Sequence, residues 1–211
     1  FVPGIPYDQD QVSKQTSLEA RISSDNDGPL EWVIGGFYSY EDTTDDTEYS
    51  TSKTVTIHRI FPELDDETWA VFGEGKFSVT DDFRVIGGLR YTWEHKVVDG
   101  TSQTTIAGTP RPAGAIYGEN TWDAVNYRVG VEYDAAPETM LFATVSTGFK
   151  AGGFYGSLPP NTYRPERLTS YEAGMRSRFL DGRLQLNIDA FYWDYSDRQE
   201  SFVGIVTGGA T

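Results

Sequence analysis

The sequence predicts an all-β protein built from about eight antiparallel strands that are long enough to cross a membrane. Three observations lead to this prediction. Apolar and polar residues alternate in runs of about 9–11 residues, the length that a tilted strand needs to cross a bilayer. Short turns and long polar segments alternate along the chain. Aromatic residues make up 14% of the 211 residues, and there are 22 glycines, a mix typical of aromatic-rich strands joined by turns.

The clearest alternation lies in the hairpin between residues 171 and 192. Apolar residues occupy one parity of its second strand and polar residues the other: Leu184, Leu186 and Ile188 against Gln185, Asn187 and Asp189. Because successive side chains of a strand point to opposite faces, one face is apolar and one is polar. The tight turn of sequence LDGR at residues 180–183 joins the two strands. We expect the leucines to face lipid and the polar residues to face a lumen.

Six stretches outside this hairpin also have strand character, whereas residues 1–11 are expected to be irregular. In chain order the strands are predicted at residues 14–23, 31–41, 69–78, 83–96, 122–134, 141–149, 171–179 and from 183 onward. Bulky apolar residues occupy both parities of 31–41, so its faces are not assigned. No run of about 18 apolar residues occurs, so no helical membrane span is expected.

The connections between these strands are short and long in turn. Short turns lie near Asp27, Asp81, Ala136 and Asp181, and long segments cover residues 42–66, 99–121 and 151–168. Outer-membrane barrels have short periplasmic turns and longer extracellular loops. The order therefore predicts an antiparallel transmembrane β-barrel segment whose three long loops share the extracellular end.

Two motifs carry a resemblance to a known family. Residues 148–154 read GFKAGGF, and residues 163–199 read YRPERLTSYEAGMRSRFLDGRLQLNIDAFYWDYSDRQ. Both resemble the mid-to-late barrel of TonB-dependent outer-membrane receptors, and residues 18–94 show a weaker likeness. The resemblance implies that residues 1–211 are a partial receptor β-barrel domain, with the plug domain and the barrel ends absent.

The same resemblance implies a function, a location and partners. The function is TonB-energised uptake of an iron–siderophore complex or a similar scarce ligand, and the location is the bacterial outer membrane. The implied partners are outer-membrane lipid and lipopolysaccharide, the ligand, the receptor's own plug domain and the TonB complex. Two other classes remain open from the residues alone: a complete small porin or adhesin barrel, and a secreted soluble β-sandwich that binds carbohydrate.

Charged residues of both signs recur on the polar parity of neighbouring strands. They are Glu19, Arg21, Arg90, Glu94, Arg128, Glu132, Glu172 and Arg176. On a sandwich this parity would be the solvated face; on a barrel it would line the lumen, with the charges paired across strands. Given the strand lengths, we expect this polar parity to line a lumen.

Aromatic residues suggest two further roles. Trp69, Trp93, Trp122, Tyr133, Trp193 and Tyr195 lie near strand ends, where a membrane barrel carries its aromatic girdles. The resemblance implies that loop and lumen aromatics contact the ligand, which makes candidates of Tyr49, Tyr117, Tyr155 and Tyr163. Taken singly, each of these tyrosines is more simply an ordinary loop residue.

Catalysis, metal binding and nucleic-acid binding are not expected. The net charge of −15 disfavours phosphate backbones. The chain has no cysteine and two distant histidines, and it lacks a nucleophile motif and a phosphate-binding glycine loop. Acids cluster in residues 41–48 and 63–67 without the ordered spacing of a calcium loop, so we interpret them as a solvated surface. The sequence therefore predicts no enzyme, no catalytic residue, no cofactor and no metal.

Overall fold

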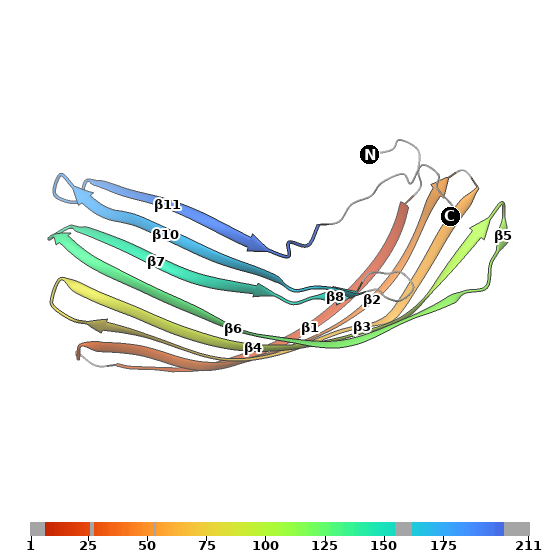
Figure 1. Ribbon diagram of the computed structural model, residues 1–211, viewed down its shortest axis with the longest axis horizontal. Coiled ribbons are helices and arrows are strands. Elements are labelled where there is room, and N and C mark those ends of the chain that lie inside the picture. The colour runs from red at the N-terminus through yellow and green to blue at the C-terminus, as the bar shows by residue number, and fades with distance from the viewer. Residues whose placement is uncertain (1–6, 26–27, 53, 155–161, 201–211) are drawn as a thin grey trace.

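The computed structural model describes residues 7–25, 28–52, 54–154 and 162–200 as one curved antiparallel sheet with a small hairpin beside it (Figure 1). The sheet order is β1-β2-β3-β4-β6-β7-β10-β11, and β5 pairs with β4. The long strands are β1 (Tyr7–Ser23), β2 (Leu30–Ser52), β3 (Val55–Ser78), β4 (Phe83–Ile106), β6 (Gly114–Ala136), β7 (Thr139–Lys150), β10 (Glu166–Phe179) and β11 (Leu184–Ser196). The short ones are β5 (Thr109–Pro110), β8 (Gly153–Phe154) and β9 (Thr162–Tyr163).

Each long strand pairs with the next long strand along the chain, so the sheet is a meander bent into a trough (Figure 1). This confirms the all-β prediction and the eight main strands. Within the described residues the one further sheet is the two-stranded β8–β9 hairpin, which covers only a small part of the concave face, and this removes the sandwich alternative. β1 and β11 are the two ends of the sheet and do not pair with each other. No helix long and apolar enough to cross a membrane occurs in the described part of the chain.

The two ends of the trough differ as the connections predict. The turns before β4, β7 and β11 lie at one end, at the left of Figure 1, and the hairpins that link β2 to β3 and β4 to β6 reach the other. In the turn before β11, residues 180–183 join the paired Phe179 and Leu184. Leu180, Asp181 and Gly182 have φ of 55°, 56° and 79°, and the Arg183 amide donates to the Leu180 carbonyl at 3.2 Å. The turn near Asp27 falls partly outside the described residues.

The first two long segments are not irregular loops, as the sequence suggested, but continuations of the strands. β2 and β3 stay paired from Leu30 to Ser52, and β4 and β6 stay paired up to Ser102. Residues 7–11, expected to be irregular, pair with β2 as well. Both faces of these extensions carry polar residues, so they lack the alternation that marks a half-buried strand; backbone pairing nevertheless continues. Of the third segment, β8 and β9 form a short hairpin, and residues 155–161 lie outside the described residues.

A β-bulge interrupts β3 between Ile60 and Glu63, against both of its neighbours. Pro62 lies within it, and proline has no amide hydrogen to give to a ladder. The extra residue reverses the parity of β3. As a result Phe61 and Leu64, an odd and an even residue, both face the concave side of the trough.

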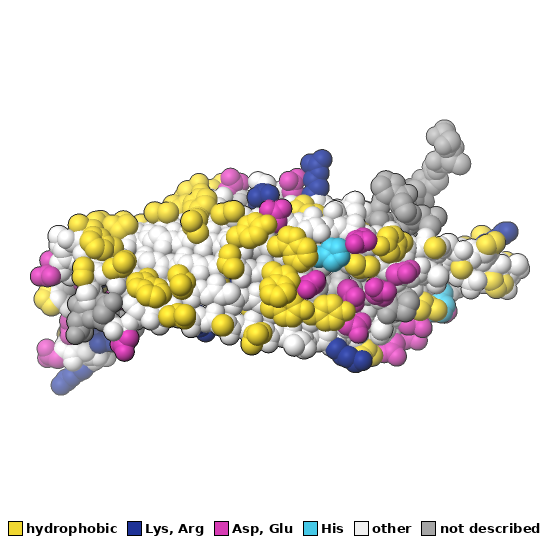
Figure 2. Space-filling view, turned by 90° about the horizontal axis from the view of Figure 1, so that it is seen from below, with side chains coloured by type: hydrophobic (Ala, Val, Ile, Leu, Met, Phe, Trp, Pro, Cys, Tyr) yellow, Lys and Arg dark blue, Asp and Glu magenta, His cyan; other side chains and the backbone are white. Residues whose placement is uncertain are grey.

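The register places the apolar parity of the long strands on the convex face, together with the even-numbered residues of β2, a strand that carries bulky apolar residues on both parities (Figure 2). Its side chains are large, apolar and exposed, among them Leu18 (68%), Val71 (61%) and Leu89 (63%). This convex belt is about 9–11 residues long on each strand, which matches the hydrocarbon core of a bilayer. Beyond it the first convex residues are polar, for example Asp42, Glu67 and His95.

Aromatic side chains mark both margins of the convex belt. At the short-turn margin lie Phe77, Phe83, Tyr133 and Phe179, and at the other margin lie Tyr40, Trp69, Trp93, Tyr171 and Tyr192. These positions are those of two interfacial girdles. The prediction for Trp122, Trp193 and Tyr195 was wrong, because their register puts them on the concave face. Position near a strand end does not determine the face; only parity does.

Candidate functional site

A pocket of about 510 Å³ opens on the concave face. It lies just beyond the convex belt, at the end of the sheet that carries the long hairpins. Strands β1 to β4 and the β8–β9 hairpin contribute its walls. The lining residues are Gln11, Glu41, Thr43, Asp45, Phe61, Leu64, Asp65, Asp66, Lys96, Val97, Val98, Gly153, Phe154 and Tyr163. We call this cavity the concave pocket. Its size falls in the range of ordinary ligand pockets.

The floor of the concave pocket is a small hydrophobic cluster. Phe61, Val98 and the fully buried Ile116 form its centre, and Leu64 and Phe154 pack against them. Phe154 comes from the β8–β9 hairpin, so this cluster attaches the hairpin to the sheet. The Phe154 ring lies directly over Gly118, where a Cβ atom would stand 2.5 Å from its Cδ1. A side chain at position 118 would therefore displace the ring and the hairpin.

Carboxylates stand above this floor. Glu41 accepts hydrogen bonds from the Ser13 hydroxyl at 2.6 Å and the Thr43 hydroxyl at 3.3 Å. Asp45 accepts one from the Gln9 amide at 2.5 Å and one from the Thr47 hydroxyl at 2.5 Å. Among the described residues, neither carboxylate has a basic group within 4.0 Å. Both are thus oriented by neutral donors, and their negative charge is not neutralised.

Lys96 is the one cation in the pocket lining. Its Nζ lies 2.9 Å from Asp66 and 2.7 Å from Glu94, and all three side chains are at least two-thirds buried. Burial alone would lower the pKa of Lys96, but hydrogen bonds to Glu94 and Asp66 outweigh it and raise that pKa. Lys96 therefore stays charged, and its charge is shared by two carboxylates of the protein.

The four tyrosines proposed from sequence separate into different environments. Tyr163 lines the concave pocket, and Tyr49 lies farther out on the concave face, with the Arg59 guanidinium 5.2 Å above its ring. Tyr117 lies on the convex face, where its hydroxyl donates to Glu119 at 2.7 Å and its pKa is raised. Tyr155 lies outside the described residues.

The eight charged residues proposed for the lumen all share the concave face. Six of them take part in ion pairs: Arg21–Glu19, Lys96–Glu94, Arg128–Glu74, Arg84–Glu132 and Arg176–Asp189. Arg90 instead places its guanidinium 5.6 Å from the rings of Phe37 and Phe72. Glu172 borders a hollow over β6, β7, β10 and β11. Towards the short-turn end, the concave charges largely neutralise one another.

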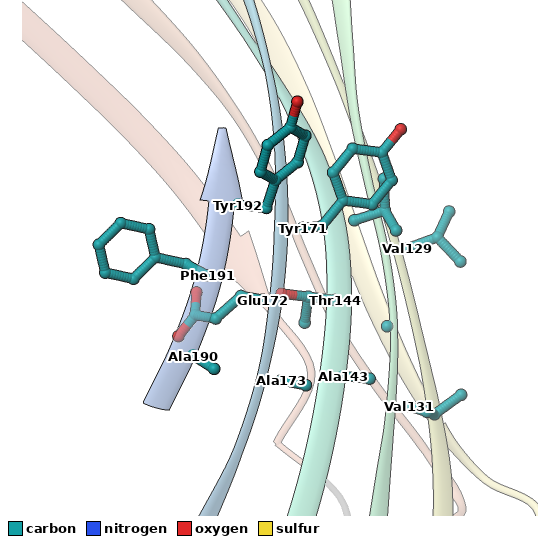
Figure 3. A pocket seen from close by; sticks show the side chains of 12 residues that line it. Val129, Val131, Ala143, Thr144, Tyr171, Glu172, Ala173, Ala190, Phe191 and Tyr192 are labelled. Atoms are coloured by element: carbon teal, nitrogen blue, oxygen red, sulfur yellow. The ribbon is translucent and has the colours of Figure 1, made fainter. Parts of the chain in front are cut away.

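That hollow, of about 570 Å³, lies over β6, β7, β10 and β11 within the convex belt. Ala143, Ala173 and Ala190 are cross-strand neighbours at its centre. Figure 3 shows Tyr171 and Tyr192 together on one side of the strands and Phe191 and Glu172 on the other. Its convex lining is apolar apart from the two phenol hydroxyls, so it offers no group that would recognise a charged ligand.

Sequence reasoning missed most of the concave pocket. The sequence assigns Phe154 only to a motif and Lys96 only to a strand. It assigns Phe61 and Ile116 to long loops, and Val98 lies between the predicted strand 83–96 and the loop that begins at residue 99. The available signal was the apolar spacing in the polar extensions, since Phe61, Leu64, Val98 and Ile116 are large apolar residues with concave register that form one cluster. In the described part of the chain no group of three metal-ligating side chains was found.

Replacing Lys96 by methionine should lower the stability of the full-length receptor by about 1–3 kcal/mol near neutral pH, because two buried acceptors lose their shared donor. Burial raises the pKa of Glu94 and Lys96 opposes that rise, so without Lys96 the pKa of Glu94 should be higher still. A carboxyl with a raised pKa in the folded state holds its proton better there than in the unfolded chain. The variant should therefore regain stability as pH falls.

Urea midpoints measured at about pH 7 and about pH 5 would test this reversal. Lys76→Met is the matched control, because the partner of Lys76, Glu31, is 62% exposed and water replaces the lost cation there. Equal stability of Lys96→Met and the parent at neutral pH would contradict the assigned network.

Comparison with known proteins agrees with this geometry. The family model described as "TonB dependent receptor-like, beta-barrel" matches residues 3–211. The metal-pseudopaline receptor CntO of Pseudomonas aeruginosa is 39% identical over 74 residues, which are 35% of this chain and 10% of CntO.

Among solved structures, the ferric yersiniabactin uptake receptor FyuA of Yersinia pestis has a TM-score of 0.77 at 19% identity, covering 92% of this chain and 30% of FyuA. The ferric-catecholate import receptor Fiu of E. coli K12, in its closed form, has a TM-score of 0.65 at 14% identity, covering 89% of this chain and 32% of Fiu. At these identities the likeness establishes the fold. The chain spans about a third of the length of these receptors.

Proposed function

The chain belongs to the family of TonB-dependent receptor β-barrels, and from this membership we propose that it forms part of the wall and the ligand-binding mouth of a receptor that takes up a scarce metal chelate. An iron–siderophore complex is the leading candidate, since the relatives are receptors for metal chelates by their descriptions. The chain is an outer-membrane protein, and its family is one of receptors rather than enzymes.

In this proposal the convex belt faces lipid and the concave face lines the lumen. The short turns are periplasmic, and the β2–β3 and β4–β6 hairpins are extracellular. Glu19, Arg21, Arg90, Glu94, Arg128, Glu132, Glu172 and Arg176 then line the lumen. The observation that supports this most strongly is that charge within the belt is confined to one face, since an ion in hydrocarbon would be costly.

Residues 1–211 would constitute part of a barrel domain in the full-length receptor. The proposed partners of that receptor are the ligand at the concave pocket, a plug domain inside the lumen, the TonB complex that energises release, and the surrounding lipid and lipopolysaccharide. Tyr49 and Tyr163 are the tyrosines placed to meet a ligand from the concave side.

Growth under iron limitation tests the proposed function. A receptor-null strain that expresses the full-length receptor should grow on a ferric chelate, and growth should require an intact TonB system. Growth that is independent of TonB would contradict energised uptake. Failure on every chelate, with the receptor folded in the outer membrane, would contradict the chelate assignment.

The segment of residues 1–211 expressed alone should not restore growth. β1 and β11 each pair on one side only in the described sheet, and lipid cannot satisfy the free backbone groups of an open edge. The same growth assay checks this expectation, with outer-membrane fractionation as the control for expression. Rescue by the isolated segment would show that it closes into a competent channel without the rest of a receptor.

A further inference from the structure

The charge of the concave pocket has a consequence for the kind of ligand that it accepts. Glu41, Asp45 and Asp66 project from the concave face into the pocket lining. Lys96 is the one cation in this lining, and Asp66 and Glu94 already neutralise its charge. The pocket therefore presents carboxylates without a free cation in its lining.

The hairpin end of the sheet, around the concave pocket, also carries net negative charge. Residues 41–67 contain nine acids and two bases. Glu41, Asp45 and Asp66 have concave register, and the other acids lie on the convex side, where Figure 2 shows acidic side chains gathered beyond the convex belt at the hairpin end. Of the bases in this part of the sheet, Arg59 lies over the Tyr49 ring at 5.2 Å. A field of one sign over a cleft concentrates counter-ions and repels ions of like charge.

The apolar floor of the pocket favours a ligand that also has an apolar part. Phe61, Leu64, Phe154 and Tyr163 give the pocket apolar and aromatic surface beside the carboxylates. A cationic group attached to a ring or an aliphatic arm would meet both features, because ammonium groups interact favourably with carboxylates and with aromatic faces. A polyanionic chelate would meet repulsion from Glu41 and Asp45 and find no free donor cation in the lining.

We propose that the concave pocket selects for a metal chelate that carries an ammonium or other cationic group, or is zwitterionic, and excludes polyanionic chelates such as ferric tris-catecholates. This inference rests on the proposed function and narrows it to a class of ligand. Glu41 and Asp45 are the selectivity residues. Phe154 and Tyr163 form the apolar side of the same site.

The test uses the purified full-length receptor and three gallium chelates of similar size. One is a trianionic tris-catecholate, one a neutral tris-hydroxamate, and one a tris-hydroxamate with a free ammonium group. The monocationic chelate should bind at least about tenfold more tightly than the trianionic one at low salt, because the pocket carboxylates attract its ammonium group and repel the catecholate charges. Added salt should narrow the difference.

The double variant Glu41→Gln, Asp45→Asn should lose most of this preference, about tenfold in the affinity ratio. Asp81→Asn, Asp82→Asn is the matched control, because it removes the same charge from a short turn at the other end of the sheet. The control should keep the parent's preference. Circular dichroism and heat-modifiable migration establish that each variant is folded.

Two results would overturn this inference and leave the proposed function intact. One is tighter binding of the trianionic chelate by the parent receptor, and the other is an unchanged preference in the double variant. In both cases chelate binding persists and the proposed function stands. Absence of binding to all three chelates, together with failed growth on their ferric forms, would instead overturn the proposed function and the inference with it.

Discussion

Replacing Ile188 by arginine is expected to destabilise the full-length receptor by about 2–4 kcal/mol, the cost of an arginine at the lipid midplane of a barrel. Ile188 is the middle convex residue of β11, between Leu184 and Tyr192, and its side chain is 53% exposed. That exposure is to lipid in the proposed orientation, so the cationic head would have to enter hydrocarbon. Equilibrium unfolding in urea from lipid vesicles measures the loss.

Asn187→Arg is the matched control, one residue away on the same strand. Asn187 pairs with Arg176 on the concave face, where water or protein would surround an added charge. Its cost should be far below that of Ile188→Arg. Equal costs for the two variants would mean that the two faces of β11 do not differ in environment.

Replacing Ile116 by alanine should lower stability by about 2–5 kcal/mol, as for other fully buried isoleucines. Ile116 is 0% exposed and lies at the centre of the cluster under the concave pocket. The cavity left behind should loosen Phe154 and with it the β8–β9 hairpin. Chelate affinity should therefore fall together with the unfolding midpoint, and both are measured on the same purified variant.

Ile106→Ala controls for the loss of apolar side chain at the same end of the sheet. Ile106 ends β4 near the hairpin tip and is 38% exposed, so little buried contact is lost. Its stability and chelate affinity should remain close to those of the parent. If Ile116→Ala behaves like Ile106→Ala, the cluster does not support the pocket.

The strands that cross the belt could be predicted from sequence because their two faces meet different media. The alternation of Leu184 to Asp189 separates these residues onto the convex and concave faces as the register has them, and the same parity argument groups all eight concave charges. A sheet wetted on both sides leaves no such signal. For that reason the sequence predicts loops where the outer parts of β2, β3, β4 and β6 lie.

The concave pocket could not be predicted because two local features determine it. The bulge at Phe61–Glu63 reverses parity within β3, and simple alternation places Phe61 on the wrong face. Phe154 reaches the cluster from a hairpin that is distant in sequence from β3 and β4. Ion pairs such as Lys96–Asp66 depend on the register between strands, which composition does not reveal.

The assignment of the convex face to lipid is tested most directly by spin labels at positions 186 and 187. The chain has no cysteine, so Leu186→Cys and Asn187→Cys can each carry a nitroxide in the full-length receptor in lipid vesicles, once any cysteine elsewhere in that receptor is replaced. The label at 186 should collide readily with oxygen dissolved in lipid and be shielded from a polar relaxation agent. The label at 187 should show far less contact with lipid-dissolved oxygen. A label at 186 that is shielded from both agents would place the leucines of β11 in a protein core and contradict the membrane assignment.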